Sequence, residues 1–141
     1  PEKHIVVVTN SLISAAELST ARHVDLFFVG GQVMGNPPSA LDNIAVNAMG
    51  QFHVNKAFVG VNGINLKVGL TSMGTPQMDL KREIIKMANQ SYVIADSSKF
   101  GNSNLFTVCP MDDIYKVITD TDVTKEIVHL AKKVKVDMDI V

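Results

Sequence analysis

The sequence predicts an α/β fold in which a mainly parallel β-sheet carries helices on both faces. Short apolar runs rich in β-branched and aromatic residues alternate along the chain with segments of helical periodicity. Several runs are apolar at successive positions, as in strands whose two faces are both covered. This alternation favours parallel strands joined by crossover helices. We expect one domain over residues 1–141, because a chain of 141 residues can bury a sizeable core and this one contains no linker or repeat.

The apolar runs give the predicted strands, and the periodic segments between them give the predicted helices. The strands are Ile5–Val8, Val24–Val29, Ala57–Val61, Tyr92–Ala95, Tyr115–Thr119 and Val134–Ile140. The helices are Leu12–Leu18, Leu41–Met49, Pro76–Ala88 and a last helix that ends near Lys133. Thr75 is the expected N-cap of the third helix, with Pro76 at its first position, and Asp122 is the expected N-cap of the last.

Composition excludes several classes of protein. Apolar residues make up 46% of the chain and charged residues 19%, so a globular fold is expected. A net charge of −1 argues against a nucleic-acid reader within these residues. The single cysteine, Cys109, is expected to pack as a small hydrophobe, and the scattered histidines lack metal-ligand spacing, so no cofactor, metal or catalytic residue is predicted.

The N-terminus gives a further set of expectations. No apolar run reaches the length of a membrane span, and no signal-peptide pattern precedes Ile5, so we expect a cytoplasmic protein without membrane contact. The chain also lacks an initiator Met, and we expect it to be part of a longer protein.

The most informative segment follows the predicted strand Tyr92–Ala95. It places Asp96, Ser97, Ser98, Lys99 and Gly101 at the carboxyl end of that strand, where open α/β sheets bind ligands. Hydroxyls, an ammonium and backbone N–H groups suit a phosphate or another oxygen-rich anion. The alternative is an ordinary polar turn, since Ser, Asp and Gly are common turn residues.

Other predicted strands also end in small or polar residues. These ends are Asn10-Ser11, Gly30-Gly31, Asn62-Gly63 and Thr119-Asp120. Together they resemble a crevice for a small polar ligand. Each has a simpler alternative: Asn10 and Ser11 can cap a helix, and two glycines can serve a tight turn alone.

The order of these motifs resembles the C-terminal sensor domain of DeoR-type bacterial transcription repressors, and within them the lactose/tagatose-pathway repressors. The matching segments are Val8–Ser11, Phe28–Gly31, Lys56–Ile64, Gly69–Thr71, Lys81-Arg82 and Ala95–Gly101. The resemblance implies a Rossmann-like sheet related to ribose-5-phosphate isomerase and glucosamine-6-phosphate deaminase. It also implies a phosphorylated sugar as effector, and operator DNA bound by an N-terminal helix-turn-helix domain that this chain does not contain.

The resemblance assigns the effector pocket residue by residue. It would use Asn10, Gly31, Gly63, Lys81, Asp96, Ser98 and Lys99, with Ser11, Gly30 and Asn62 added from the strand ends. Two departures stand out. The family's Asp-Ser-Gly-Thr-Thr-like phosphate loop belongs to a β/α unit upstream of Pro1, so we expect weak effector binding by these residues alone and an exposed flank near Ile5–Val8. The family's Glu four residues before the Lys-Arg pair is replaced by Gln77.

Three functions compete at this point. An effector-sensing regulatory domain, as a homo-oligomer, agrees best with the motifs. A sugar-phosphate isomerase or deaminase would need a positioned general base, for which Asp96 and Asp120 are candidates without a paired motif. A pure oligomerisation module would bind no sugar phosphate.

Overall fold

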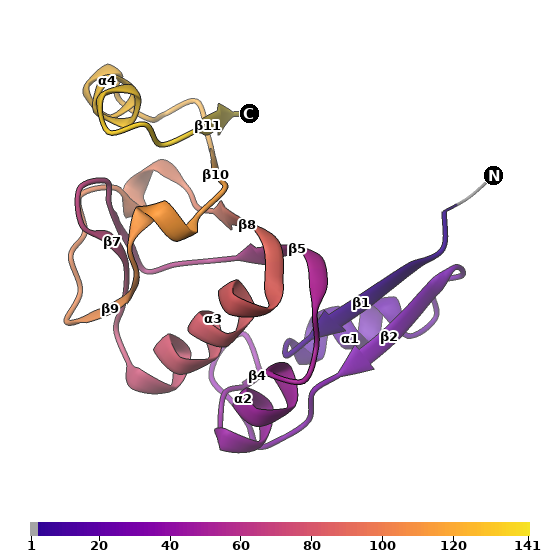
Figure 1. The fold of residues 1–141 in the computed structure, drawn as a ribbon. Helices are drawn as coiled ribbons and strands as arrows, with labels where there is room; N and C mark the ends of the chain where they lie inside the picture. Colours follow the sequence, from indigo (N-terminus) through magenta and orange to yellow (C-terminus); the bar gives the residue numbers. More distant parts are fainter. Residues whose placement is uncertain (1–2) are drawn as a thin grey trace. The chain divides into compact units, whose positions relative to one another are not determined.

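The computed structural model describes residues 3–141 and divides the chain into two compact units, Pro1–Phe52 and His53–Val141. Each unit contains parallel strands and helices (Figure 1). The predicted α/β class with a mainly parallel sheet is confirmed. The single domain over residues 1–141 stays a prediction. No helix within the described residues is long and apolar enough to cross a membrane.

The first unit begins with a β-α-β segment. Strand β1 (Ile5–Thr9) pairs in parallel with β2 (Val24–Phe28), and helix α1 (Leu12–Leu18) connects them. Among the described strands β1 pairs with β2 alone. Within the described residues no strand pairs with its other edge, and Ile5 and Val6 are 50% and 58% exposed, as expected for the flank near Ile5–Val8.

A short hairpin and a second helix complete this unit. The hairpin consists of β3 (Val33–Met34) and β4 (Ser39–Ala40), which pair antiparallel. Helix α2 (Asn43–Met49) follows, and the Asp42 carboxylate caps it by accepting from the Ala45 N–H at 3.1 Å. The predicted start at Leu41 was two residues too early, because Asp42 is the capping residue.

The second unit is built on a four-stranded parallel sheet in the order β11-β10-β8-β5. Its strands are β5 (Val54–Val59), β8 (Ala88–Ile94), β10 (Lys116–Thr119) and β11 (Met138–Ile140). Helix α3 (Thr75–Met87) lies between β5 and β8 in the chain, and α4 (Lys125–Lys133) lies between β10 and β11.

Two predicted helix caps were wrong. Thr75 is the first residue of α3, and its N-cap is Gly74, which has no side chain to bond the helix. The N-cap of α4 is Thr124, whose hydroxyl accepts from the Ile127 N–H at 3.3 Å, and not Asp122. Asp122 instead lies in a turn, where its N–H donates to Asp120.

A second, antiparallel sheet was not predicted. It contains β6 (Gly63–Asn65), β7 (Gly69–Ser72) and β9 (Phe106–Cys109) in the order β6-β7-β9. Gly69–Ser72 is not among the predicted strands, but it forms β7 and all of its residues are buried. The sequence Gly-Leu-Thr-Ser gave no strand signal because its burial comes from tertiary packing between two neighbours.

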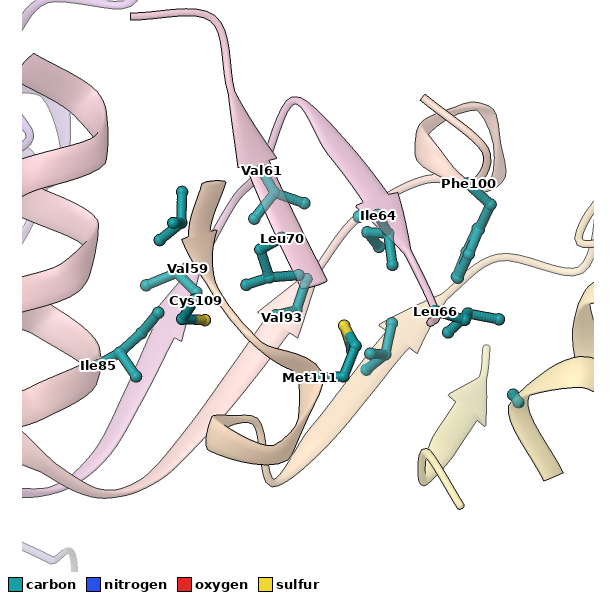
Figure 2. Close-up of a cluster of buried hydrophobic side chains, with 14 residues drawn as sticks. Val59, Val61, Ile64, Leu66, Leu70, Ile85, Val93, Phe100, Cys109 and Met111 are labelled. Atoms are coloured by element: carbon teal, nitrogen blue, oxygen red, sulfur yellow. The ribbon is translucent and has the colours of Figure 1, made fainter. Parts of the chain in front are cut away.

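The core of the second unit joins both sheets to the helices (Figure 2). Val59, Val93 and Val117 stand in register on three neighbouring strands of the parallel sheet. Leu70 of β7 and Ile85 of α3 pack into the same cluster. Cys109 is also buried there, 7% exposed, as a small hydrophobe. The antiparallel sheet is therefore part of the same core as the parallel one.

Candidate functional site

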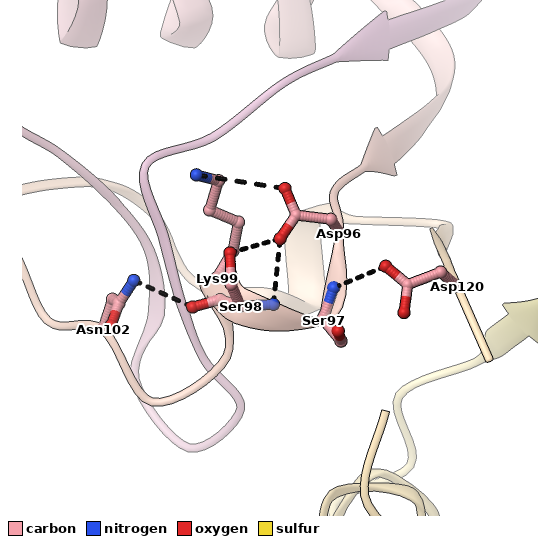
Figure 3. A network of polar contacts seen from close by, with 6 residues as sticks. All are labelled: Asp96, Ser97, Ser98, Lys99, Asn102 and Asp120. Carbon is pink, nitrogen blue, oxygen red and sulfur yellow. Dashed lines mark hydrogen bonds and ion pairs between the residues drawn. The ribbon is translucent and has the colours of Figure 1, made fainter. Parts of the chain in front are cut away.

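The turn after β8 is held by the carboxylate of Asp96 (Figure 3). Its Oδ1 accepts from the Ser98 N–H at 2.9 Å and from the Ser98 hydroxyl. Its Oδ2 lies 4.0 Å from the ammonium of Lys99. Asp96 thus caps the short 3-10 helix η1 (Ser97–Lys99) and holds Lys99 beside it.

A second carboxylate reaches the same turn from the neighbouring strand. Asp120 follows β10, which is paired in parallel with β8. Its Oδ2 accepts from the Ser97 N–H at 2.9 Å, and its Oδ1 accepts from the Asp122 N–H at the same distance. The carboxyl ends of these two strands therefore form one polar patch, the strand-end turn, made of residues 96–101 with Asp120 and Asn102.

Gly63 lies behind the strand-end turn. A Cβ at this position would be 2.6 Å from the Thr71 hydroxyl and 2.8 Å from the Asn104 amide, and would also collide with the Asn102 carbonyl. The Asn102 side chain in turn donates to the Ser98 carbonyl at 3.0 Å. Glycine is thus required at position 63 by a close approach of the chain that supports the turn.

The two carboxylates are both held in their charged form. Hydrogen bonds from the Ser98 side chain and N–H lower the pKa of Asp96, and the N–H of Ser97 is the largest cause of the lowered pKa of Asp120. Each N–H that bonds a carboxylate is no longer available to a ligand. The charged groups left for a ligand are the free lone pairs of the two carboxylates and the ammonium of Lys99.

This geometry predicts an acid-labile turn. A lowered folded-state pKa stabilises the folded form above the ordinary Asp value of 3.8, and this contribution is lost as the pH falls below it. The amide signals of Ser97 and Ser98 should therefore titrate below pH 3.8 in an NMR series. In Asp120→Asn the titration at Ser97 should vanish while that at Ser98 persists. Persistence at both amides would show that Asp120 does not hold the turn.

The same pKa directions weigh against proton-transfer chemistry. A general base works best with a pKa near the pH of its surroundings. Asp96 and Asp120 are both shifted downward, away from neutral pH. They are weak bases and suit hydrogen-bond acceptance better.

Lys81, another predicted pocket residue, makes no hydrogen bond or ion pair to the described residues of the strand-end turn. It is half-buried on α3, and desolvation lowers the pKa of its ammonium. Within the described residues it forms no ion pair. An ammonium that is partly desolvated and unpaired is suited to an anion, although no hydrogen bond links it to residues 96–101.

Asn62 and its neighbours have a structural role in the second unit. The Asn62 side-chain oxygen accepts from the Met73 N–H at 3.2 Å and from the Ser72 hydroxyl at 3.4 Å. These bonds tie the loop after β5 to the end of β7. Asn62 therefore shapes the loop that leads into Gly63.

In the first unit the residues after β1 are engaged with their own chain. The Asn10 amide donates to the Ala40 carbonyl at 3.1 Å. Ser11 is the N-cap of α1, and its hydroxyl accepts from the Ser14 N–H at 3.2 Å. The capping alternative therefore describes Ser11, and Asn10 anchors the β3–β4 hairpin.

Of the two glycines after β2, Gly31 allows a close approach of Asp42. Gly30 and Gly31 have φ values of 75° and 108°, which favour glycine. A Cβ on Gly31 would lie 3.1 Å from the Asp42 carboxyl carbon. That carboxylate accepts from the Gln32 N–H at 2.9 Å, which is the largest cause of its lowered pKa. At this predicted effector-binding position the backbone already bonds a carboxylate of the protein.

Two residues that bond the strand-end turn from outside the segment 96–101 were missing from the predicted pocket. Asp120 was noted at a strand end but not assigned to the pocket, and Asn102 was not noted. Asp120 had a signal in the sequence, because it ends the strand that pairs with the Tyr92 run. Asn102 had none, since its contact depends on how the loop after Gly101 folds back on Ile64.

Comparison with known proteins identifies relatives of this chain. Residues 1–121 match the family described as "DeoR C terminal sensor domain". The uncharacterized HTH-type transcriptional regulator YulB of Bacillus subtilis is 30% identical over 138 residues, covering 96% of this chain and 54% of the relative. The HTH-type transcriptional regulator IolR of the same bacterium is 29% identical, covering 89% of this chain and 50% of the relative.

A more distant relative has the word repressor in its name. The putative aga operon transcriptional repressor of Escherichia coli O157:H7 is 26% identical over 137 residues, covering 97% of this chain and 51% of the relative. This chain therefore spans about half the length of these relatives.

Proposed function

Because this chain belongs to the DeoR C-terminal sensor domain family, we propose that it senses a phosphorylated sugar and thereby controls DNA binding by a transcription repressor. The family is a regulatory one, and the relatives are named as transcriptional regulators, so the domain acts as a sensor and not as an enzyme. The identity of the effector as a sugar phosphate rests on the strand-end turn.

The observation that carries the proposal is the meeting of Asp96, Asp120 and Lys99 at the ends of two adjacent parallel strands. Ionised carboxylates accept hydrogen bonds from sugar hydroxyls, because both oxygens keep lone pairs beyond those used by Ser97 and Ser98. The ammonium of Lys99 is the anion-binding group of this turn. A ligand with several hydroxyls and one phosphate matches both the carboxylates, which accept from the hydroxyls, and the ammonium of Lys99, which binds the phosphate.

The hydrogen bonds of the backbone N–H groups in the strand-end turn indicate which groups are left to bind a phosphate. The N–H groups of Ser97 and Ser98 already bond carboxylates, and those of Lys99, Phe100 and Gly101 bond carbonyls. Phosphate binding at this turn therefore depends on side-chain charge. Lys99 is one source of that charge, and Lys81, which forms no ion pair within residues 3–141, is the second that we propose.

Regulation then follows from differential binding. A ligand shifts a two-state protein only by as much as it prefers one state. A sugar phosphate that draws Lys99 away from Asp96 would favour one arrangement of the strand-end turn. In the full-length protein, which we propose to be a homo-oligomer, that arrangement alters the spacing of the DNA-binding domains.

A thermal-shift series tests the proposal. Full-length protein is heated with sugar phosphates, the matching free sugars and inorganic phosphate. A true effector should raise the melting temperature, since a ligand at about 100 times its Kd stabilises by about 2.7 kcal/mol. The free sugar should give a smaller rise. Equal melting temperatures with every sugar phosphate would refute the proposal, and turnover of any of them would restore the enzyme alternative.

A further inference from the structure

A cleft of about 510 Å³ lies between α3 and β9, at a place that the sensor function does not use. Its lining residues are Arg82, Ile85, Lys86, Val108, Cys109, Pro110 and Asp113. None of them belongs to the strand-end turn. The volume is within the range of small-molecule sites in proteins. All of the lining residues belong to the second unit, so the cleft is described by the geometry of that unit alone.

The floor of the cleft is apolar. Ile85, Val108 and Cys109 are 8%, 3% and 7% exposed, and Figure 2 shows Ile85 and Cys109 side by side. Burial raises the pKa of the Cys109 thiol to about 12, so this side chain is neutral at ordinary pH. The apolar part of a ligand can therefore bury its surface against this floor.

Two lining residues on one wall of the cleft, Arg82 and Lys86, carry positive charge, and within the described residues neither forms an ion pair. Arg82 donates from Nε to the Val108 carbonyl at 2.9 Å and from Nη2 to the Thr107 carbonyl at 2.6 Å. These bonds fix the guanidinium against β9 and leave its charge intact. Lys86 lies one turn further along α3.

The opposite wall carries a single negative charge. Asp113 lies in the short 3-10 helix η2 (Met111–Asp113), and its charge acts on Cys109 in the opposite sense to that of Arg82. A ligand with one anionic group can place it near Arg82 and Lys86. A second anionic group would meet Asp113, which disfavours it.

We propose that this cleft is a second binding site, which takes a small organic monoacid with an apolar body. The carboxylate lies between the guanidinium of Arg82 and the ammonium of Lys86, and the apolar body lies on Ile85, Val108 and Pro110. Arg82 keeps the N–H groups of Nη1 for this contact, because the hydrogen bonds to β9 use only Nε and Nη2. The site is independent of the sugar-phosphate proposal.

An NMR titration tests the site with defined probes. 4-Methylpentanoate should shift the amide signals of Ile85, Val108 and Cys109 in a saturable way. 4-Methylpentanamide lacks the charge and acetate lacks the apolar body, so both should bind at least fivefold more weakly. Equal shifts from acid and amide, shifts without saturation, or shifts confined to residues 96–101 would each overturn the proposal.

Substitutions at Lys86 and Asp113 test which side of the cleft binds the ligand's carboxylate. Lys86→Gln should weaken 4-methylpentanoate binding by roughly fivefold, the factor expected for an exposed ion pair worth about 1 kcal/mol. Asp113→Asn should leave the affinity unchanged or raise it. Lys132→Gln, on α4 and outside the cleft, is the matched control and should have no effect. A loss of affinity in Asp113→Asn equal to that in Lys86→Gln would contradict the assigned orientation.

Discussion

Replacing Gly69 by alanine is expected to destabilise the second unit by about 3 kcal/mol or more, the sum of a steric collision and backbone strain. A Cβ at Gly69 would lie 2.9 Å from both the Cys109 carbonyl carbon and the Pro110 Cα, and would collide with the Cys109 carbonyl oxygen. These are backbone atoms of Cys109, the last residue of β9, and of Pro110, which follows it, and they cannot rotate away. The φ of Gly69 is 147°, which an alanine rarely adopts.

Gly60→Ala is the matched control for this experiment. A Cβ at Gly60 would have nothing within 4 Å, and no left-handed backbone is required there. Its free energy of unfolding in urea should be equal to or slightly above that of the original protein, because alanine restricts the unfolded chain. An unchanged midpoint for Gly69→Ala would mean that β7 and β9 separate easily, and that the antiparallel sheet is not part of the core.

The parallel sheet was readable from the sequence because local signals and tertiary packing agree there. Helix α1 has the predicted bounds, and β1 extends the predicted run by one residue. The run Tyr92–Ala95 buries Val93 and Ala95 in the core, whereas Ile94 is 52% exposed, so the core covers only one face of this strand. By contrast, the predicted strand Val134–Ile140 contracts to β11, since Val134 and Lys135 complete the end of α4.

The antiparallel sheet could not be predicted for a physical reason. Strands of three or four residues such as β6 and β7 are too short to show a period of two. Their burial comes from partners distant in sequence, as in the bond from the Asn104 N–H to the Thr71 hydroxyl at 3.1 Å. Burial of Ser72 and Thr71 is likewise a product of the fold and leaves no apolar pattern.

The strand-end turn was predicted better in its position along the chain than in its hydrogen bonds. The sequence located the turn at Asp96, because polar residues that end a buried strand are visible without a structure. It did not show that carboxylates already bond the N–H groups of Ser97 and Ser98. The same applies to the predicted effector-binding residue Gly31, against which the Asp42 carboxylate lies. Tertiary contacts determine which acceptor each backbone N–H bonds, and the sequence alone does not show them.

Lys99→Ala is expected to weaken sugar-phosphate binding by about 1.5–3 kcal/mol, or roughly 10- to 150-fold in Kd. Because the N–H groups of Ser97 and Ser98 are engaged, the side chain of Lys99 supplies the anion contact of this turn. Stability should change little, since its ammonium lies at the limit of ion-pair distance from Asp96, 4.0 Å, and is partly exposed.

Calorimetric titration of the full-length protein measures this loss. Lys67→Ala, an exposed lysine outside the strand-end turn, is the control and should retain the affinity of the original protein. The Ser98 amide should titrate at slightly higher pH in Lys99→Ala, because the Lys99 charge helps to lower the pKa of Asp96. That shift verifies that the turn is still folded. Equal affinity for Lys99→Ala and the original protein, with the turn intact, would show that residues 96–101 only cap the end of β8 and that the effector's phosphate binds elsewhere.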